Sequence, residues 1–207
     1  MKNKTLLLVE TNFIMDYGLR RDKNIPYLFN LCIDGKIYLA VPEFSIEEFK
    51  KSVALKNRNR MKKLKQTIEL ANEIERSEHL KEYANIMKSS AKTLMQKHQE
   101  ETTRALSILD EVIEPLILIP FTADSQSFYT SQEKCPELED NFVYESVHHF
   151  IKTNRKDYDN IIFYTKNKKD FDKPRIIQEM NELKAKIMFS SKECIKDLIR
   201  LGLIQLQ

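Results

Sequence analysis

Apolar positions along the chain fall into short runs separated by longer segments with helical spacing. We predict a strand at each of the five short runs, residues 6–9, 36–41, 116–120, 160–165 and 185–190, and expect the first of them to be buried. Helical spacing predicts helices at residues 14–33, 45–51, 136–154 and 192–203. Strands that alternate with helices are typical of a parallel sheet with helices on both faces. We therefore predict an α/β fold of three layers, α/β/α, with a central, mostly parallel sheet of about five strands.

The middle of the chain has a different pattern. Between Lys50 and Ile108 there is no Gly and no Pro, and strong helix formers dominate. This predicts two or three long helices that carry charge on one side and end before Pro115. The Ser-, Thr- and Gln-rich segment 121–135 is predicted to be a loop. We treat residues 1–207 as one domain with residues 56–114 as a helical insertion.

Composition narrows the class of protein. A net charge of +3 permits a nucleic-acid partner without requiring one. Cys32, Cys135 and Cys194 lack metal-ligand spacing, as expected of reduced thiols in a cytoplasmic protein. The first apolar run is interrupted by Glu10 and is too short for a signal peptide, and no run approaches the ~18 apolar residues of a membrane helix. We therefore predict a soluble, cytoplasmic protein.

Acidic and amide side chains follow the predicted strands. Glu10 comes directly after the first strand, and Glu48 lies about one helical turn beyond the second. Asp140 begins the helix before the fourth strand, and Asn167 and Asp170 follow that strand. The carboxyl ends of parallel strands border the usual ligand site, so we expect these side chains to converge. Converging acids repel each other unless a cation lies between them, and Mg²⁺ or Mn²⁺ prefers oxygen ligands. The pattern predicts one or two such ions, which could activate water and stabilise charge on a phosphate.

Each of these residues also has a purely structural explanation. Glu10 could cap a helix, and Glu48 beside Glu47 could be a surface acid. Asp140 could be an acid favoured by a helix N-terminus, and Asn167 a turn residue. Their shared position in the predicted sheet favours the metal site. A receiver-like phosphotransfer domain is disfavoured because no Asp follows the third strand, and an ATPase because there is no Gly-rich phosphate loop.

Four segments resemble the PIN domain, a metal-dependent nuclease fold: "LLLVETNF", "IYLAVPEFSIEEF", "ELEDNFVYESVHHFIKTN" and "IIFYTKNKKDF". The family's first motif, an acid followed by Thr and Asn, is similar to Glu10, Thr11 and Asn12. The second and third acids of the family correspond to Glu48 and Asp140. The resemblance covers residues 4–55 and 116–194, and the long helical insertion is more like the larger PIN-like proteins than the compact toxins.

The resemblance implies hydrolysis of RNA phosphodiester bonds by an endoribonuclease. It implies that Glu10, Glu48 and Asp140 are catalytic and hold Mg²⁺ or Mn²⁺, with Asn167 or Asp170 completing the set of ligands. Supporting hydrogen bonds would come from Thr11, Asn12 and Thr165.

Two departures from the family pattern define an alternative. Glu10 stands where the family has Asp, and Asn167 replaces the acid between Thr165 and Asp170. Both changes favour a weak or inactive PIN-like protein that binds nucleic acid or a protein partner.

Basic residues near these acids are candidates for binding the RNA backbone. Eight lie without an intervening acid: Lys50, Lys51, Lys56, Arg58, Arg60, Lys62, Lys63 and Lys65. A second group, Lys166, Lys168 and Lys169, follows the fourth strand. A solvated helix face is the alternative for the longer run. Besides RNA, an antitoxin or other protein and a second copy of the chain are the partners that the resemblance suggests.

Overall fold

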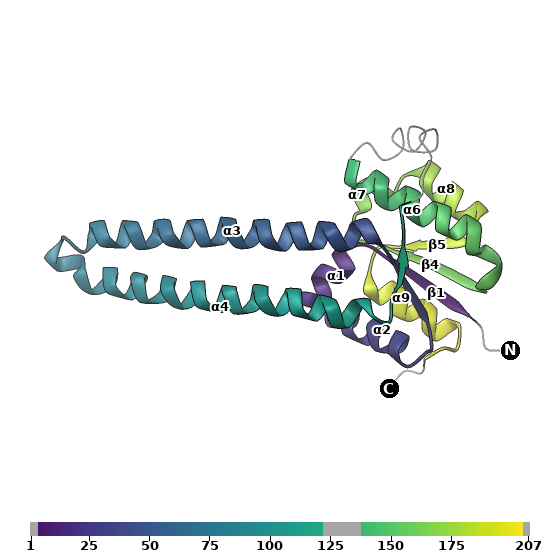
Figure 1. Ribbon diagram of the computed structural model, residues 1–207, viewed down its shortest axis with the longest axis horizontal. Helices are drawn as coiled ribbons and strands as arrows, with labels where there is room; N and C mark the ends of the chain where they lie inside the picture. Colours follow the sequence, from purple (N-terminus) through teal and green to yellow (C-terminus); the bar gives the residue numbers. More distant parts are fainter. Residues whose placement is uncertain (1–3, 122–137, 205–207) are drawn as a thin grey trace. The chain divides into compact units, whose positions relative to one another are not determined.

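A five-stranded, all-parallel sheet forms the centre of the α/β part of the chain (Figure 1). The computed structural model describes residues 4–121 and 138–204. The strand order is β3-β2-β1-β4-β5, with these bounds: β1 Thr5–Val9, β2 Tyr38–Pro42, β3 Ile117–Ile119, β4 Asn160–Tyr164 and β5 Ala185–Met188. The predicted α/β fold and its parallel sheet are confirmed. The predicted loop 121–135, including Cys135, lies outside the described residues except for Phe121.

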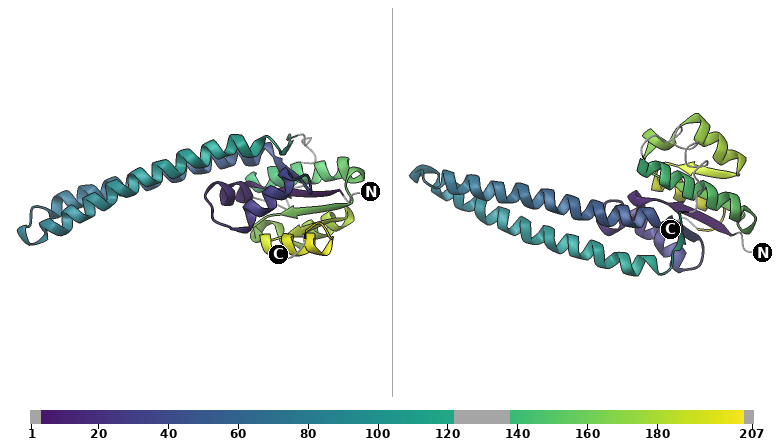
Figure 2. Two further views of the ribbon diagram at one scale, coloured as in Figure 1. Left: turned by 90° about the horizontal axis from the view of Figure 1, so that it is seen from below. Right: turned by 45° about the horizontal axis from the view of Figure 1, so that its top comes forward.

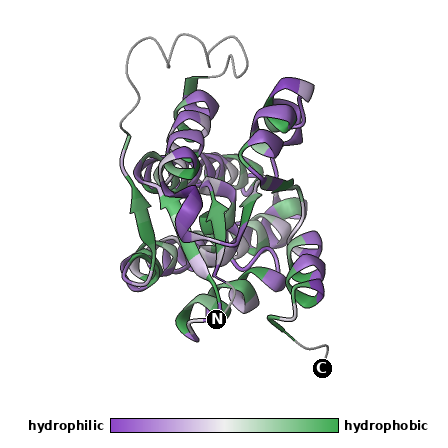
Figure 3. Ribbon diagram, turned by 90° about the vertical axis from the view of Figure 1, so that its right-hand side faces the viewer, coloured by the Kyte–Doolittle hydropathy of each residue, from purple (hydrophilic) through white to green (hydrophobic). Residues whose placement is uncertain are grey.

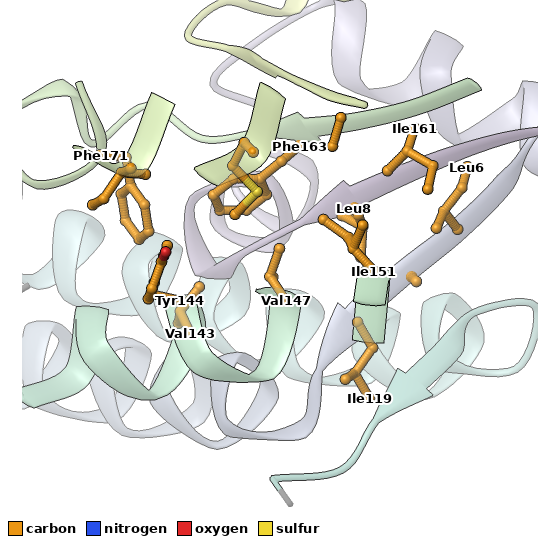
Figure 4. Packing of buried hydrophobic residues seen from close by; sticks show 14 residues of the cluster. Leu6, Leu8, Ile119, Val143, Tyr144, Val147, Ile151, Ile161, Phe163 and Phe171 are labelled. Atoms are coloured by element: carbon orange, nitrogen blue, oxygen red, sulfur yellow. The ribbon is translucent and has the colours of Figure 1, made fainter. Parts of the chain in front are cut away.

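The two faces of the sheet are covered by different helices. Alternate residues of a strand point to opposite faces. Leu6 and Leu8 of β1 pack in one core cluster with residues of α6 (Leu138–Asn154), α7 (Lys168–Phe171) and α8 (Pro174–Glu182), as Figure 4 shows. The other face is covered by α1 (Thr11–Gly18), α2 (Asn24–Ile33) and α9 (Ser191–Arg200). Figure 3 shows hydrophobic strands between helices that carry hydrophilic residues. The central strands β1, β2 and β4 are mostly buried, whereas the edge strands β3 and β5 are partly exposed.

The chain changes direction across the sheet at β1. β2 and β3 lie on one side of β1, and the chain then returns to add β4 and β5 on the other side. The register pairs Val9 of β1 with Tyr164 of β4, so Glu10 and Thr165 leave neighbouring strands at the same edge. The point where strand order reverses is where open parallel sheets usually bind ligands. The topology therefore positions Glu10 at the expected site.

The single helix predicted at residues 14–33 is wrong. Two helices, α1 and α2, replace it, and the chain breaks between them at Arg20, which adopts a positive φ of 50°. The Asp22 carboxylate accepts a hydrogen bond from the Asn24 backbone N–H at 3.0 Å, a local turn that begins α2. The prediction also omitted α7 and α8, although Pro174 at the start of α8 is a typical first helical residue.

The middle of the chain forms a helical hairpin. α3 (Glu43–Ile74) and α4 (Lys81–Ile113) run side by side and are joined through the short 3₁₀ helix η1 (Glu78–Leu80) (Figure 2). The sequence predicted two or three long helices in this region, and the structure has two, of which α4 ends before Pro115 as predicted. The chain divides into two compact units, residues 1–49 with 111–207 and residues 50–110. The description as one domain with an insertion stays a prediction.

Two further sequence predictions concern membranes and thiols. Among the described residues, no helix is long and apolar enough to cross a membrane. Cys32 and Cys194 are free thiols. Burial, with a contribution from Glu193 and Asp197, raises the pKa of Cys194 to about 12 and keeps it protonated.

Candidate active site

Glu10 ends β1 and caps α1. Its Oε2 accepts a hydrogen bond from the Asn12 backbone N–H at 2.8 Å. Its Oε1 accepts from the Asn12 side-chain amide at 2.9 Å and from the Thr165 hydroxyl at 3.2 Å. The residue is only 5% exposed. The carboxylate thus ties the end of β1 to the end of β4.

Burial dominates the electrostatics of Glu10. Desolvation raises the pKa of its carboxyl, although hydrogen bonds from Asn12, Thr165 and the Lys166 backbone oppose the shift. The N-terminus of α1 also favours a negative charge there. No cationic side chain of the described residues forms an ion pair with Glu10. A buried carboxylate without a cationic partner is the kind of group that a metal ion can stabilise.

Glu48 is placed beside the first motif by α3. The Thr11 hydroxyl donates a short hydrogen bond to Glu48 Oε2 and also lies 3.5 Å from the Ser45 carbonyl oxygen. Glu48 is half-buried, whereas its neighbour Glu47 is exposed. The structure therefore brings Glu48 to the first motif through Thr11.

Asn167 joins the remaining candidates. Its backbone N–H donates to the Thr165 hydroxyl at 3.0 Å, and its side-chain Nδ2 donates to Asp140 Oδ1 at 2.9 Å. Its Oδ1 accepts the Asp170 backbone N–H at 3.3 Å and caps α7. The cap fixes the orientation of the amide, so Asn167 presents a hydrogen-bond donor to Asp140. Asp170 itself is buried and lies 3.8 Å from the Lys173 ammonium.

The donor set fits a hard divalent cation in chemistry, because three separate segments each supply a carboxylate and such cations prefer oxygen ligands. Thr11 connects Glu48 to the first motif, and Thr165 with Asn167 connects Glu10 to Asp140. In the described part of the chain, however, no group of three or more acidic, His or Cys side chains is arranged to hold a metal ion as it stands. Metal binding would compete with the hydrogen bonds from Thr11 and Asn167.

Sequence reasoning missed a polar cluster next to this site. The Lys166 ammonium pairs with Asp16 and lies 3.3 Å from Asp22 Oδ2, and the Ser191 hydroxyl donates to the same Asp22 oxygen at 2.9 Å. Asp16 is 6% exposed, and the Tyr164 hydroxyl beside the cluster is buried. Burial lowers the pKa of Lys166, but the two carboxylates outweigh it and raise the pKa overall. An acid within the apolar pattern of a predicted helix, as at Asp16, was the available signal.

The ion pairs of Lys166 with Asp16 and Asp22 would compete with the predicted binding of RNA by this lysine. Two carboxylates already neutralise its ammonium. Lys168 and Lys169 are exposed, and the Lys168 ammonium lies 5.5 Å from the centre of the Phe189 ring. For all three lysines, contact with a phosphate stays a prediction.

We expect Lys166→Met to destabilise the protein by about 2 kcal/mol, because it leaves the buried Asp16 carboxylate without its cation. The lysine side chain is 37% exposed, and this keeps the loss of stability below that of a fully buried ion pair.

The effect of Lys166→Met should depend on pH through Asp22. Burial raises the pKa of Asp22, but hydrogen bonds from Asn24, Ser191 and Lys166 lower it overall from 3.8. A lowered carboxyl pKa stabilises the fold above the unfolded value, and this stabilisation is lost as pH falls through the folded value. The difference from wild type should therefore shrink below about pH 4. Urea unfolding across pH measures it, with the exposed Lys192→Met as control; equal effects of both variants would contradict the prediction.

One comparison with known proteins identifies a family. A family model described as PIN domain matches residues 7–171. No curated protein and no solved structure matches the chain. The matched range spans well over half of the 207 residues and includes every acid of the candidate site. PIN domains are generally nucleases and typically use divalent metal ions. The chain therefore belongs to the PIN domain family.

Proposed function

We propose that the protein is a cytoplasmic endoribonuclease that uses Mg²⁺ or Mn²⁺ to hydrolyse RNA phosphodiester bonds. One observation carries the proposal: at the point where strand order reverses, hydrogen bonds through Thr165 and Asn167 link Glu10 to Asp140, and Glu48 accepts a hydrogen bond from Thr11, the residue after Glu10. Ligands bind at this position in open parallel sheets. Membership of a nuclease family supports the reaction class.

Each side chain then has a distinct part. The carboxylates of Glu10, Glu48 and Asp140 would hold the ion, with Asn167 or Asp170 as a further oxygen donor. A bound ion of this kind supplies positive charge to the reacting phosphate and lowers the pKa of water. Thr11 and Thr165 fix the directions of the Glu48 and Glu10 carboxylates through their hydroxyl groups.

The orientation of Asn167 supports a second candidate function. Its amide nitrogen already donates to Asp140, so this position offers Asp140 a neutral partner in place of a fourth carboxylate. A site with fewer charges binds divalent ions more weakly. This favours a PIN-like protein that binds RNA or a protein partner, such as an antitoxin, without cleaving RNA. Metal binding by the purified protein separates the two candidates.

We expect Glu48→Gln to lower kcat/KM for cleavage of single-stranded RNA by about 100-fold or more, because it removes one of three charges that would hold the ion. Glu47→Gln changes the neighbouring, exposed residue by the same amount of charge and should leave kcat/KM within about twofold. Both variants are assayed in Mg²⁺, Mn²⁺ and EDTA, together with Asp140→Asn.

Cleavage that needs Mg²⁺ or Mn²⁺ and is lost in Glu48→Gln and Asp140→Asn would support the nuclease. Equal activity of the Glu47 and Glu48 variants would remove Glu48 from the site. No metal binding by calorimetry, together with no cleavage of several RNAs, would overturn the enzyme and leave the binding protein.

A further inference from the structure

The helical hairpin is held together by small apolar residues and a few polar pairs. Ala71 on α3 and Ala84, Ala91 and Ala105 on α4 are fully or almost fully buried. Small side chains allow two helices to approach closely. Polar contacts mark the antiparallel register: the Lys88 ammonium lies 2.6 Å from Glu75, and Arg60 lies 3.4 Å from His98 and 3.8 Å from Glu101. The outer surface of the hairpin is therefore left for other roles.

Positive charge is concentrated in one half of the hairpin. Residues 50–65 carry eight Lys and Arg and no acid, and all eight side chains are exposed. The facing segment of α4, residues 95–110, adds two basic and three acidic residues. In the half that contains the turn, residues 66–94, four basic residues accompany five acids. We call residues 50–65 and 95–110 the open half and residues 66–94 the turn half.

Four cations of the open half follow one side of α3. Lys51, Arg58, Lys62 and Lys65 are spaced by seven, four and three residues, which is the spacing of one helix face. At 1.5 Å per residue they form a strip roughly 21 Å long. No carboxylate of the described residues forms an ion pair with any of them, whereas Arg60 has Glu101 nearby. We call these four residues the basic strip.

The basic strip weakens its own helix. Arg58 with Lys62 and Lys62 with Lys65 are like-charge pairs four and three residues apart, and each pair destabilises a helix by about 0.2–0.5 kcal/mol. The turn half instead contains the Glu75–Lys88 ion pair. A row of unneutralised cations is most stable when a polyanion lies along it.

We propose that the basic strip binds the phosphate backbone of single-stranded RNA, independently of base sequence. This inference deepens the proposed function and rests on it for the choice of RNA. Residues 50–65 contain no aromatic side chain, and aromatic residues are the usual anchors of protein interfaces, so a protein partner is the poorer fit. Cations spaced along one side of a helix match a chain of phosphates.

The test measures binding separately from cleavage. Full-length protein carrying Asp140→Asn is titrated in EDTA into a fluorescent oligouridylate, and anisotropy gives Kd at several salt concentrations. The triple variant Arg58→Gln, Lys62→Gln, Lys65→Gln should bind at least about tenfold more weakly. Each lost phosphate contact removes about 0.7 from the slope of log K against log salt, so the slope should fall by roughly 2.

A matched control removes the same charge from the turn half. Arg76→Gln, Lys81→Gln, Lys92→Gln takes three exposed cations away and should change the slope by well under 1. The proposal would be overturned if both triple variants lost the same RNA affinity, or if the strip variant lost none. It would also be overturned if polyglutamate displaced the labelled RNA as effectively as unlabelled RNA does. If the Asp140-containing protein fails to cleave RNA but binding still depends on the basic strip, only the proposed catalysis fails.

Discussion

Glu10→Gln is expected to lower RNA cleavage by about 100-fold or more and, at neutral pH without metal, to make the protein more stable by about 1 kcal/mol. The negative charge of Glu10 would stabilise a bound cation, but it contributes little to the stability of the metal-free fold. Burial raises the pKa of this carboxyl despite hydrogen bonds from Asn12, Thr165 and the Lys166 backbone. Desolvation therefore outweighs these hydrogen bonds.

A glutamine can keep two of the three local hydrogen bonds, and it loses the one that the Asn12 side-chain amide donates to Oε1 at 2.9 Å. Its oxygen can accept from the Asn12 backbone N–H, where Glu10 Oε2 now does so at 2.8 Å. Its NH₂ group can donate to the Thr165 hydroxyl, which accepts as readily as it donates. The cap of α1 is thus retained while the buried charge is removed, and activity should fall by about 100-fold or more because the ion loses a ligand.

The pH dependence has a definite sign. The unfolded Glu10 has a pKa near 4.5, and the folded value is higher. The native state therefore binds more protons between the two values, and stability falls as pH rises through that window. The stabilising effect of Glu10→Gln should be absent below pH 4.5, appear as pH rises through the folded pKa and stay constant above it.

Urea unfolding in EDTA from about pH 4 to pH 8 measures this difference. Glu10→Asp keeps the charge on a shorter side chain and serves as the control, because it should retain the loss of stability with rising pH. Adding Mn²⁺ should stabilise wild type and leave Glu10→Gln unchanged, since only the native wild type gains a bound ion. If Glu10→Gln proves less stable at every pH, Glu10 is a structural cap whose charge the fold requires.

The sequence was sufficient to predict the parallel sheet and the strand ends at which the candidate acids lie. Consecutive apolar runs such as Leu6–Val9 are typical of strands that are buried on both faces, and the structure has β1 there. Residues that follow neighbouring parallel strands lie at the same edge of the sheet whatever the details of the loops, so the sequence alone places Glu10 and Asn167 at one edge. The choice of Glu48 over Glu47 came from the spacing of the family's second motif, and in the structure Glu48 accepts a hydrogen bond from Thr11.

Orientations and short breaks could not be predicted. The direction of the Asn167 amide depends on the cap of α7, a four-residue helix that has no clear apolar period. The break between α1 and α2 depends on a positive φ at Arg20, a residue type without a preference for it. The pairing of Lys166 with Asp16 joins residues that are far apart in sequence, and both carry charges that usually lie at the surface.

We expect Asn167→Asp to raise the affinity for Mn²⁺ by about tenfold or more and to increase the cleavage rate, because it restores a fourth carboxylate beside Asp140. One oxygen of the new side chain can still accept the Asp170 backbone N–H and cap α7. The other would replace the amide nitrogen that now lies 2.9 Å from Asp140 Oδ1, so two carboxylates would face each other. Without metal, this repulsion should destabilise the protein by about 1–2 kcal/mol at neutral pH and raise the pKa of one of the two acids.

Calorimetry with Mn²⁺ and urea unfolding in EDTA measure the two effects on the same protein. Asn181→Asp makes the same chemical change on an exposed side chain and should alter neither quantity. Opposite changes in the two quantities would be the informative result. If the site binds a cation, an added carboxylate should lower the stability of the metal-free protein and raise the stability of the Mn²⁺-bound protein. A variant that loses stability without gaining Mn²⁺ affinity would mean that the Asn167 amide is the proper partner of Asp140, and the protein would then be a PIN domain that binds without cleaving.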